Sequence, residues 1–314
     1  MSRPTLSLLI PAYNAAPYLP RLLDSARAQT RPFDEIWVYD DCSTDNTAEV
    51  AMAHGAKALR GAVNKGCSAG KNALAKHVET DWIHFHDADD ELLPNFVELA
   101  HKWIAKDQFD VVLFDYEYRD NETNELILTQ RFDRAALETD PKRYSIGKQI
   151  NPFCGLYRRS AYLALGGYDE DQKILYAEDS AFHRKLAFGN LSFSSEDELS
   201  IINYRLSSSM SAQNRVKCAI SNMESFKLCL TYSESKEYHR EIARELWHVA
   251  TLLLSYDEKE LATESAKLAL KLAPQVRPSG TPLFEGLSMF FPLTGIMLRE
   301  RAIRFFKPTL REMS

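Results

Sequence analysis

The chain has 314 residues, of which 45% are hydrophobic and 26% are charged, and these proportions exclude collagen-like and wholly disordered proteins. Its length predicts about two domains, or one large α/β domain with an appendage. The 38 Lys and Arg residues against 44 Asp and Glu residues leave a formal net charge of −6. That charge argues against a general nucleic-acid-binding protein, but it is compatible with a locally basic face.

The five cysteines are scattered and form no CxxC pair, which favours free thiols in a reducing compartment over a disulfide framework or a zinc site. The N-terminal residues lead directly into an apolar strand, without the pattern of a signal peptide. The apolar stretch 286–298 is broken by Pro292 and is shorter than the ~20 residues that a membrane-spanning helix needs. We therefore expect a cytoplasmic protein.

Strands and helices alternate over the first ninety or so residues, which implies a parallel sheet covered by helices. Short apolar runs predict the strands, and apolar residues at helical spacing after N-cap or Pro signals predict the helices. The predicted strands are 6–10, 35–39, 58–60 and 82–86, and the predicted helices are 17–29, 43–53 and 71–77, with a turn at 66–70.

The remainder of the chain is less regular. A helix is expected near 94–106, and two strands, 110–118 and 125–131, can pair across the turn at 120–123. The stretch 150–167 is rich in loop-forming and aromatic residues, and a helix is expected after Asp179. From about residue 215 the composition becomes helical, with an antiparallel pair at 236–256 and 258–273, a Pro-containing linker at 274–282 and a final amphipathic segment.

An acidic cluster directly follows the strand at 82–86 and contains Asp87, Asp89 and Asp90. Carboxylates at the carboxyl end of a buried strand repel one another and lose hydration, unless a divalent cation or a polar ligand neutralises them. That edge of an open α/β sheet is also where ligands bind. Oxygen ligands select Mg²⁺ or Mn²⁺. The alternative is an Asp-rich turn that caps the next helix, and the pattern alone leaves both open.

A second acid pair, Asp40 and Asp41, follows the strand at 35–39. These carboxylates can accept hydrogen bonds from a base imide or a ribose hydroxyl, or they can cap the following helix, and the two roles are compatible. His84 and His86 share one face of the strand at 82–86, where histidines satisfied by protein partners are favoured over metal ligands because hard ions prefer oxygen.

Four segments in order resemble the signatures of the family 2 glycosyltransferases, which have the GT-A fold. They are Ile10–Asn14, Asp40–Thr47, Asn64–Asn72 and the DXD-containing Asp87–Asp90. The resemblance covers roughly residues 5–212. It implies a Rossmann-like, mostly parallel sheet flanked by helices, and a sugar-nucleotide-dependent transferase that uses Mn²⁺ or Mg²⁺ and inverts the anomeric centre.

The resemblance also implies roles for individual residues. Lys71 would contact the base or a phosphate, Asp87 the ribose or the donor sugar, and Asp89 the cation that bridges the diphosphate. The residues expected at the nucleoside are Pro11, Tyr13, Asn14, Asp40 and Asp41.

The likeness continues less sharply beyond residue 150. The segments 151–159 and 166–170 resemble the donor-sugar and acceptor region, with Gly155 in the first. Glu178 and Asp179 resemble the acidic pair that supplies the catalytic base, and we nominate Asp179. An N-cap with a first-turn acid is the alternative for this pair. Asp90 and Arg205 are expected to contact the diphosphate or the acceptor.

Three positions depart from the family pattern. Cys42 replaces the usual glycine, which costs strain if that position needs a positive φ. Lys71 replaces an arginine and so loses bidentate geometry. Tyr204 and Arg205 are not followed by the histidine that members often carry, because residues 206–211 read Leu-Ser-Ser-Ser-Met-Ser.

We therefore expect a GT-A catalytic domain at 1–214, with a donor-binding half at about 1–110 and an acceptor half at about 111–214, and a helical region at 215–314. The expected partners are a nucleotide-sugar donor and a glycan or lipid-linked acceptor, without nucleic acid, and a homo-oligomer is left open. The basic tail at 296–311 either contacts the inner face of the cell membrane or packs on protein. The alternative functions are a non-catalytic nucleotide-sugar-binding or glycan-binding subunit and a nucleotidyltransferase.

Overall fold

The computed structural model describes residues 3–206, 213–307 and 309–312. The chain forms two compact units. Unit 1 comprises Met1–Tyr144, Ile150–Glu170 and Lys185–Ser209, and unit 2 comprises Ser145–Gln149, Asp171–Arg184 and Met210–Ser314. None of the described helices combines the length and the apolar composition required to cross a bilayer.

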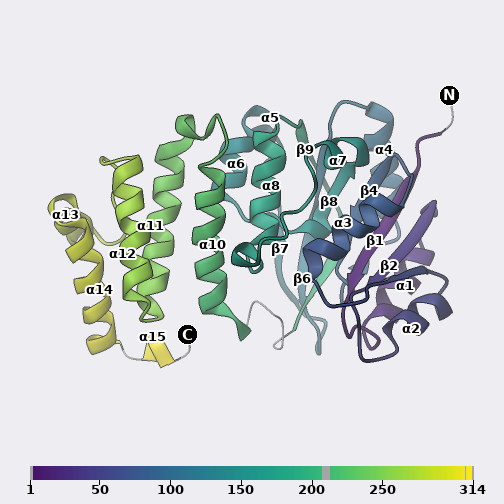
Figure 1. The fold of residues 1–314 in the computed structure, drawn as a ribbon, viewed down its shortest axis with the longest axis horizontal. Coiled ribbons are helices and arrows are strands. Elements are labelled where there is room, and N and C mark those ends of the chain that lie inside the picture. The colour runs from purple at the N-terminus through teal and green to yellow at the C-terminus, as the bar shows by residue number, and fades with distance from the viewer. Residues whose placement is uncertain (1–2, 207–212, 308, 313–314) are drawn as a thin grey trace. The chain divides into compact units, whose positions relative to one another are not determined.

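The described residues of unit 1 build a nine-stranded sheet with the order β3-β2-β1-β4-β8-β6-β9-β5, and β7 pairs with β6 outside this path (Figure 1). Its first four strands are parallel, so their carboxyl ends meet at one edge. These strands are β1 (Leu6–Ala12), β2 (Glu35–Asp40), β3 (Lys57–Arg60) and β4 (Trp82–Phe85). The fully buried Leu8, Leu9 and Ile10 explain why β1 takes a central position.

The helices α1 (Leu19–Arg27), α2 (Thr47–Ala53) and α3 (Cys67–His77) connect these strands, as the sequence predicted. The predicted turn at 66–70 is wrong, because α3 already begins at Cys67. Gly66 is its N-cap residue and has a φ of 88°, a conformation that glycine adopts without steric cost.

The rest of unit 1 extends the sheet with strands of both directions. The predicted pairing across residues 120–123 is confirmed, since β6 (Val111–Asp120) and β7 (Leu126–Gln130) are antiparallel neighbours. The loop-rich region expected at 150–167 is partly wrong. It contains β8 (Gly155–Arg158), which lies antiparallel between β4 and β6, and α7 (Arg159–Ala164). The remaining elements are β5 (Glu91–Leu92), α4 (Phe96–Lys106), α5 (Arg134–Thr139) and β9 (Phe193–Arg205).

Unit 2 is helical in its described residues. The predicted antiparallel pair is α11 (His239–Ser255) and α12 (Lys259–Leu272), which pack together through the small buried residues Ala262 and Ala266. The other helices are α10 (Arg215–Cys229), α13 (Pro282–Phe290), α14 (Pro292–Phe306) and α15 (Thr309–Glu312). Two helices, α6 (Pro141–Gly147) and α8 (Glu178–Phe188), each contribute residues to both units.

Candidate active site

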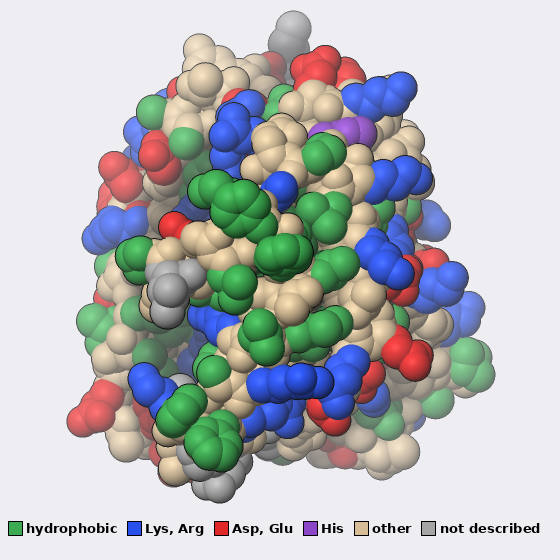
Figure 2. Space-filling view, turned by 90° about the vertical axis from the view of Figure 1, so that its left-hand side faces the viewer, with side chains coloured by type: hydrophobic (Ala, Val, Ile, Leu, Met, Phe, Trp, Pro, Cys, Tyr) green, Lys and Arg blue, Asp and Glu red, His purple; other side chains and the backbone are tan. Residues whose placement is uncertain are grey.

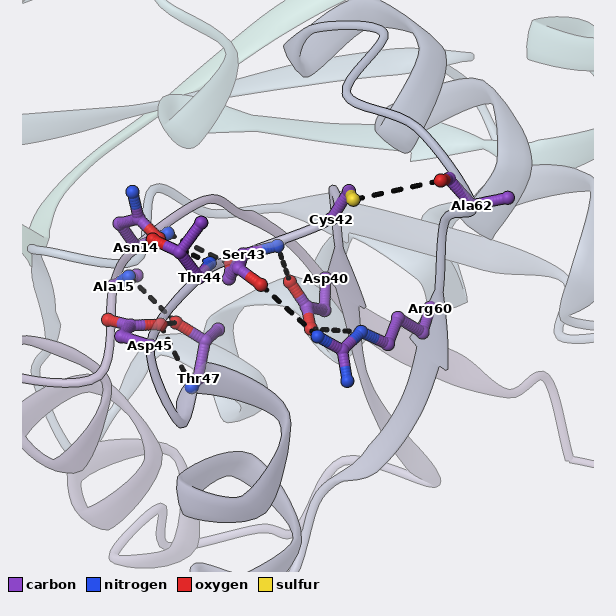
Figure 3. A network of polar contacts seen from close by, with 10 residues as sticks. All are labelled: Asn14, Ala15, Asp40, Cys42, Ser43, Thr44, Asp45, Thr47, Arg60 and Ala62. Carbon is purple, nitrogen blue, oxygen red and sulfur yellow. Dashed lines mark hydrogen bonds and ion pairs between the residues drawn. The ribbon is translucent and has the colours of Figure 1, made fainter.

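The loops that follow β1 and β2 are joined by hydrogen bonds at the carboxyl edge of the sheet (Figure 3). Asn14 has a φ of 50°, and its Oδ1 accepts a hydrogen bond of 2.9 Å from the backbone N–H of Thr44. In return, the backbone N–H of Asn14 donates to Ser43 Oγ at 2.9 Å. The two loops therefore form one rigid rim, on which the side chain of Tyr13 is 52% exposed and available to a ligand.

Asp40 ends β2 and is completely buried. Its Oδ1 accepts a 2.8 Å hydrogen bond from the backbone N–H of Ser43, and its Oδ2 lies 3.3 Å from Nε of Arg60 on β3 (Figure 3). Asp40 thus shapes the turn that presents the following residues. The helix-capping alternative for this acid pair is wrong, because α2 begins at Thr47 and its N-cap residue is Asn46.

Asp41 connects the turn after β2 to the start of α3. Its carboxylate accepts hydrogen bonds from the backbone N–H groups of Lys65 and Gly66, at 2.9 Å and 2.7 Å. An ionised carboxylate offers about four lone-pair sites, so Asp41 keeps acceptor capacity for a ligand hydroxyl or imide while it orders this loop.

Cys42 has a φ of 63°, which is the conformation that the family's glycine adopts without cost. Its Sγ lies 3.7 Å from the carbonyl oxygen of Ala62 (Figure 3). We expected backbone strain at Cys42 if its φ were positive, and the positive φ shows that this strain is present.

Lys71 and Asn72, on the first turns of α3, reach the Gly-Gly-Tyr segment after α7. The Lys71 side chain is only 1% exposed, and its Nζ lies 4.5 Å from the centre of the Tyr168 ring. Asn72 Oδ1 accepts hydrogen bonds from the backbone N–H of Tyr168 and from the hydroxyl of Tyr162, and its Nδ2 donates to Glu170 at 2.8 Å. The buried Asn72 amide therefore anchors the expected sugar-binding segment to α3.

The acidic cluster forms the turn between β4 and β5. Asp87 and Asp89 are half-buried, and burial raises the pKa of Asp89, an effect opposed by the positive charge of Arg21. Burial and the charges of its two acidic neighbours raise the pKa of Asp90 well above its ordinary value. A nearby cation stabilises the charged form of such buried carboxyl groups and so offsets the effect of burial on their pKa.

Asp90 holds the turn against β9. Its two carboxyl oxygens accept hydrogen bonds from Nδ2 of Asn203 at 2.7 Å and from the backbone N–H of Tyr204 at 2.9 Å. The next residue, Arg205, is exposed, and its guanidinium lies 3.9 Å from the centre of the Tyr118 ring. The predicted departure at 207–211, the missing histidine, lies outside the described residues.

The residues present fit a hard divalent cation that shares its ligands with a diphosphate. Mg²⁺ in such sites takes one or two carboxylates, and substrate phosphates and water complete the shell. Asp89, the expected ligand, is a half-buried carboxylate in the turn after a buried strand, and Asp87 lies two residues before it. Within 3–206, 213–307 and 309–312, no group of three or more His, Cys, Asp or Glu side chains is arranged to hold a metal by itself.

His84 on β4 and His86, which directly follows this strand, are fully buried. Nδ1 of His84 lies 2.8 Å from the carbonyl oxygen of Gly155, and its Nε2 lies 3.0 Å from Nδ1 of His86. Burial lowers the pKa of His84 to about 4 and that of His86 well below its ordinary value.

Gly155, at the start of β8, leaves room for the Tyr157 hydroxyl, which would lie 2.0 Å from a Cβ atom at this position.

Glu178 and Asp179, the expected catalytic acids, occupy the first turn of α8 and belong to unit 2. First-turn acids favour the positive end of the helix dipole. The backbone oxygen of Asp179 lies 2.8 Å from Nδ1 of His183, one turn further along the helix. The assignment of Asp179 as the base stays a prediction.

Arg21 is a site residue that the sequence did not reveal. From α1 its Nη2 donates to the backbone oxygen of Asp89 at 2.5 Å and to Oδ1 of Asn121 at 3.1 Å, and the guanidinium stacks 3.8 Å from the Tyr204 ring. In the sequence, the position of Arg21 indicated only that it lies outside the apolar face of α1. The contact with the acidic turn depends on how α1 and β9 pack.

The mixed α/β sheet, with two acidic loops and a buried lysine at the carboxyl ends of its parallel strands, has the GT-A fold that solved glycosyltransferases share. The chain belongs to glycosyl transferase family 2, whose family model matches residues 7–166.

Two curated relatives show how far the likeness extends. An uncharacterized glycosyltransferase of Rickettsia typhi is 32% identical over 187 residues, which cover 57% of this chain and 58% of that protein. Chondroitin synthase of Pasteurella multocida is 38% identical over 109 residues, or 33% of this chain and 11% of that enzyme. The chain thus spans little more than half the length of the first of these relatives and a small part of the second.

Two solved structures share the fold at low identity. The mannosyltransferase PcManGT of Pyrobaculum calidifontis, in complex with GDP-Man and Mn²⁺, is 18% identical with a TM-score of 0.59, covering 100% of this chain and 84% of that one. S. aureus TarS 1-349, in complex with UDP-GlcNAc, is 17% identical with a TM-score of 0.56, covering 86% of this chain and 91% of that one.

Proposed function

We propose that this glycosyltransferase moves a sugar from a nucleotide-diphosphate-sugar to a glycan or lipid-linked acceptor, with a divalent cation and with inversion, in the synthesis of a surface polysaccharide. The observation that carries the proposal is the pair of half-buried carboxylates, Asp87 and Asp89, at the end of β4. Relatives that include a polysaccharide synthase and a fold neighbour that binds a nucleotide sugar with Mn²⁺ support it.

Residues of unit 1 bind and orient the donor in this proposal. Asp89 would hold Mn²⁺ or Mg²⁺, a cation that would offset the charge on the leaving diphosphate. Asp87 beside it contacts the ribose or the donor sugar. Lys71, which is buried beside Tyr168, contacts the base or a phosphate. The nucleoside contacts the rim made by the loops after β1 and β2, through Pro11, Tyr13, Asn14 and Asp41, and the buried Asp40 holds the turn of this rim in place.

The remaining residues act on the acceptor side or hold others in place. Asp179 removes the proton from the attacking hydroxyl, and Glu178 is the other candidate for this role. Arg205 contacts the diphosphate or the acceptor. Asp90 and Gly155 position the acidic turn and β8, in accordance with the partners described above. We further propose a catalytic domain at 1–214 and a location at the inner face of the cell membrane.

A thermal-shift panel tests the donor proposal directly. UDP-, GDP- and dTDP-sugars are added with and without Mn²⁺, and one donor class is expected to raise the melting temperature only with the cation, because a ligand that binds the native state alone stabilises it. Slow donor hydrolysis without an acceptor then separates an enzyme from a binding subunit. No shift with any nucleotide sugar would overturn the proposal.

Asp179→Asn tests the base assignment. The rate of sugar transfer is expected to fall about 10²- to 10⁴-fold, the usual contribution of general-base catalysis, while the donor still raises the melting temperature. Glu178→Gln is the matched control, since it removes the neighbouring charge. Wild-type turnover by Asp179→Asn together with a large loss in Glu178→Gln would assign the base to Glu178 instead.

A further inference from the structure

Unit 2 contains a basic cavity that plays no part in the proposed transfer reaction. Its volume is about 790 Å³, and it lies among α11, the linker at 273–281 and α14. Of the ionisable side chains that line it, five are basic and Glu245 alone is acidic. The basic ones are Arg240, Arg244, His248, Arg277 and Arg299.

The helix α11 supplies one wall of this cavity. Arg240, Arg244 and His248 follow one another at a spacing of four residues, so their side chains lie on one face of the helix. Within the described parts of the chain, no hydrogen bond or ion pair joins Arg240 or Arg244 to another residue. These two exposed guanidinium groups therefore keep all their donors for a ligand.

Two further arginines are held in place on the opposite elements. Arg277 donates to the backbone carbonyls of Pro274, Val276 and Met289, the last from its Nε at 3.3 Å. Arg299 lies 4.9 Å from the centre of the Phe284 ring. These guanidinium groups are pre-oriented, which lowers the entropy that binding an anion would cost.

The same elements expose a set of large apolar side chains, which we call the apolar crest. Around the junction of α13 and α14, Met289, Phe290 and Phe291 are 61%, 76% and 62% exposed. At the end of α14, Phe305 and Phe306 are 78% and 76% exposed. Figure 2 looks onto this side and shows hydrophobic side chains gathered beside Lys and Arg. Exposed apolar side chains grouped as at this junction mark an interaction site.

The cavity and the part of the crest at the α13–α14 junction belong to one surface, because Arg277 bonds to the backbone of Met289 and Arg299 contacts α13. Two of the basic residues in the tail at 296–311 are paired with an acid and add little charge to this surface. Arg304 and Arg311 are both paired with the buried Glu300, at 2.9 Å and 2.7 Å. The arginines of the cavity and the exposed Arg301 and Lys307 therefore supply the charge that is available to a partner.

Cationic groups beside exposed aromatic rings complement an amphiphile with a negatively charged head. A soluble anion would use the arginines alone, whereas a lipid surface uses both features, and stable peripheral binding needs two such signals. We propose that the arginine cavity binds the phosphate of an anionic lipid headgroup while the apolar crest enters the acyl layer. The inference deepens the membrane location proposed above and rests on it.

Vesicle flotation of the full chain tests the cavity. Vesicles of phosphatidylcholine with phosphatidylglycerol are expected to bind the protein, and vesicles of phosphatidylcholine alone are not. Arg240→Gln with Arg244→Gln should weaken binding about 30-fold, at the usual contribution of a basic residue near such a surface. The matched control is Lys267→Gln with Lys271→Gln, two exposed lysines of α12 outside the cavity. Equal losses in both pairs would overturn a specific headgroup site.

The apolar crest is tested by Phe290→Ser with Phe291→Ser, and the control is Leu126→Ser with Ile127→Ser, exposed residues of β7. Vesicle binding should fall at least about tenfold in the first pair only, because two aromatic rings would no longer enter the acyl layer. Melting temperatures check folding, since all four side chains are exposed.

Two other results would overturn the proposal. Inorganic diphosphate that displaces the protein from vesicles, with the Phe variants binding vesicles normally, would assign the cavity to a soluble anion. A dimer that the Phe variants dissociate, without vesicle binding, would assign the crest to a second copy of the chain. Donor hydrolysis measured without vesicles is independent of both results, so the membrane site and the transfer reaction can fail separately.

Discussion

The charged side chains at the acidic edge of unit 1 and in the basic cavity of unit 2 differ in their burial and in their hydrogen bonding. In unit 1 the carboxylates of Asp40, Asp41 and Asp90 are buried and take hydrogen bonds from backbone N–H groups of neighbouring loops. In unit 2, Arg240 and Arg244 are exposed and have no such partners among the described residues. Substitutions at the acidic edge should therefore change stability together with function, and those in the cavity should change binding alone.

Asp89 should break this rule within unit 1 and give the largest effect. Asp89→Asn is expected to reduce transfer about 10²- to 10³-fold, because the cation's several kcal/mol of transition-state stabilisation are lost. Removal of metal by chelation should do the same to the wild type. Stability should stay unchanged or rise, since burial already disfavours the charged form of Asp89. Metal titration of the transfer rate and a thermal melt measure both effects, and a variant with wild-type dependence of the rate on Mn²⁺ concentration would contradict this assignment.

Asn72 should follow the rule. Asn72→Ala leaves the backbone N–H of Tyr168 and the hydroxyl of Tyr162 without their acceptor in a buried place, and the expected loss is about 3 kcal/mol of unfolding free energy. Donor affinity should fall with it, because the segment at 166–170 loses its anchor. Denaturant unfolding measures the change, with the exposed Asn64→Ala as control. A stable variant with weakened donor binding would show that Asn72 acts on the ligand directly.

The buried histidine pair makes the acidic edge sensitive to pH. The pKa of His84 is lowered from its ordinary value of 6.5 to about 4, so between these two values only the unfolded chain is protonated. The unfolding free energy should therefore fall by about 3 kcal/mol as the pH falls through this window. The raised pKa values of Asp89 and Asp90 act in the opposite sense. The contribution of His84 is measured as the difference between wild type and His84→Gln in the dependence of the unfolding free energy on pH. The same dependence in both proteins would refute this contribution.

Cys42 should give the smallest effect, and it concerns the backbone alone. At a φ of 63°, Cys42→Gly is expected to raise the unfolding free energy by about 1 kcal/mol, because a side chain in this region is strained. A small rise in melting temperature with unchanged transfer would be the supporting result. A lower melting temperature would show that the contact of Sγ with Ala62 outweighs the strain.

The sequence by itself determined the features that depend on local order along the chain. The apolar runs of β1, β2 and β4, the helices between them and the acids that follow them all lie within the first ninety residues, so their parallel arrangement and shared edge follow from periodicity and connection length. The helical pair of unit 2 was equally predictable, because the apolar spacing of α11 and the alanines of α12 are local patterns.

Only the tertiary structure decided the contacts between distant segments. The strand β8 was hidden because four residues that begin with a glycine carry little strand signal, and its place between β4 and β6 comes from backbone pairing. The contact of Arg21 with the acidic turn and the convergence of Arg244, Arg277 and Arg299 on one cavity likewise join residues far apart in the chain. Hydrophobic patterns specify which face of an element is buried, but the neighbour that covers it is selected by packing.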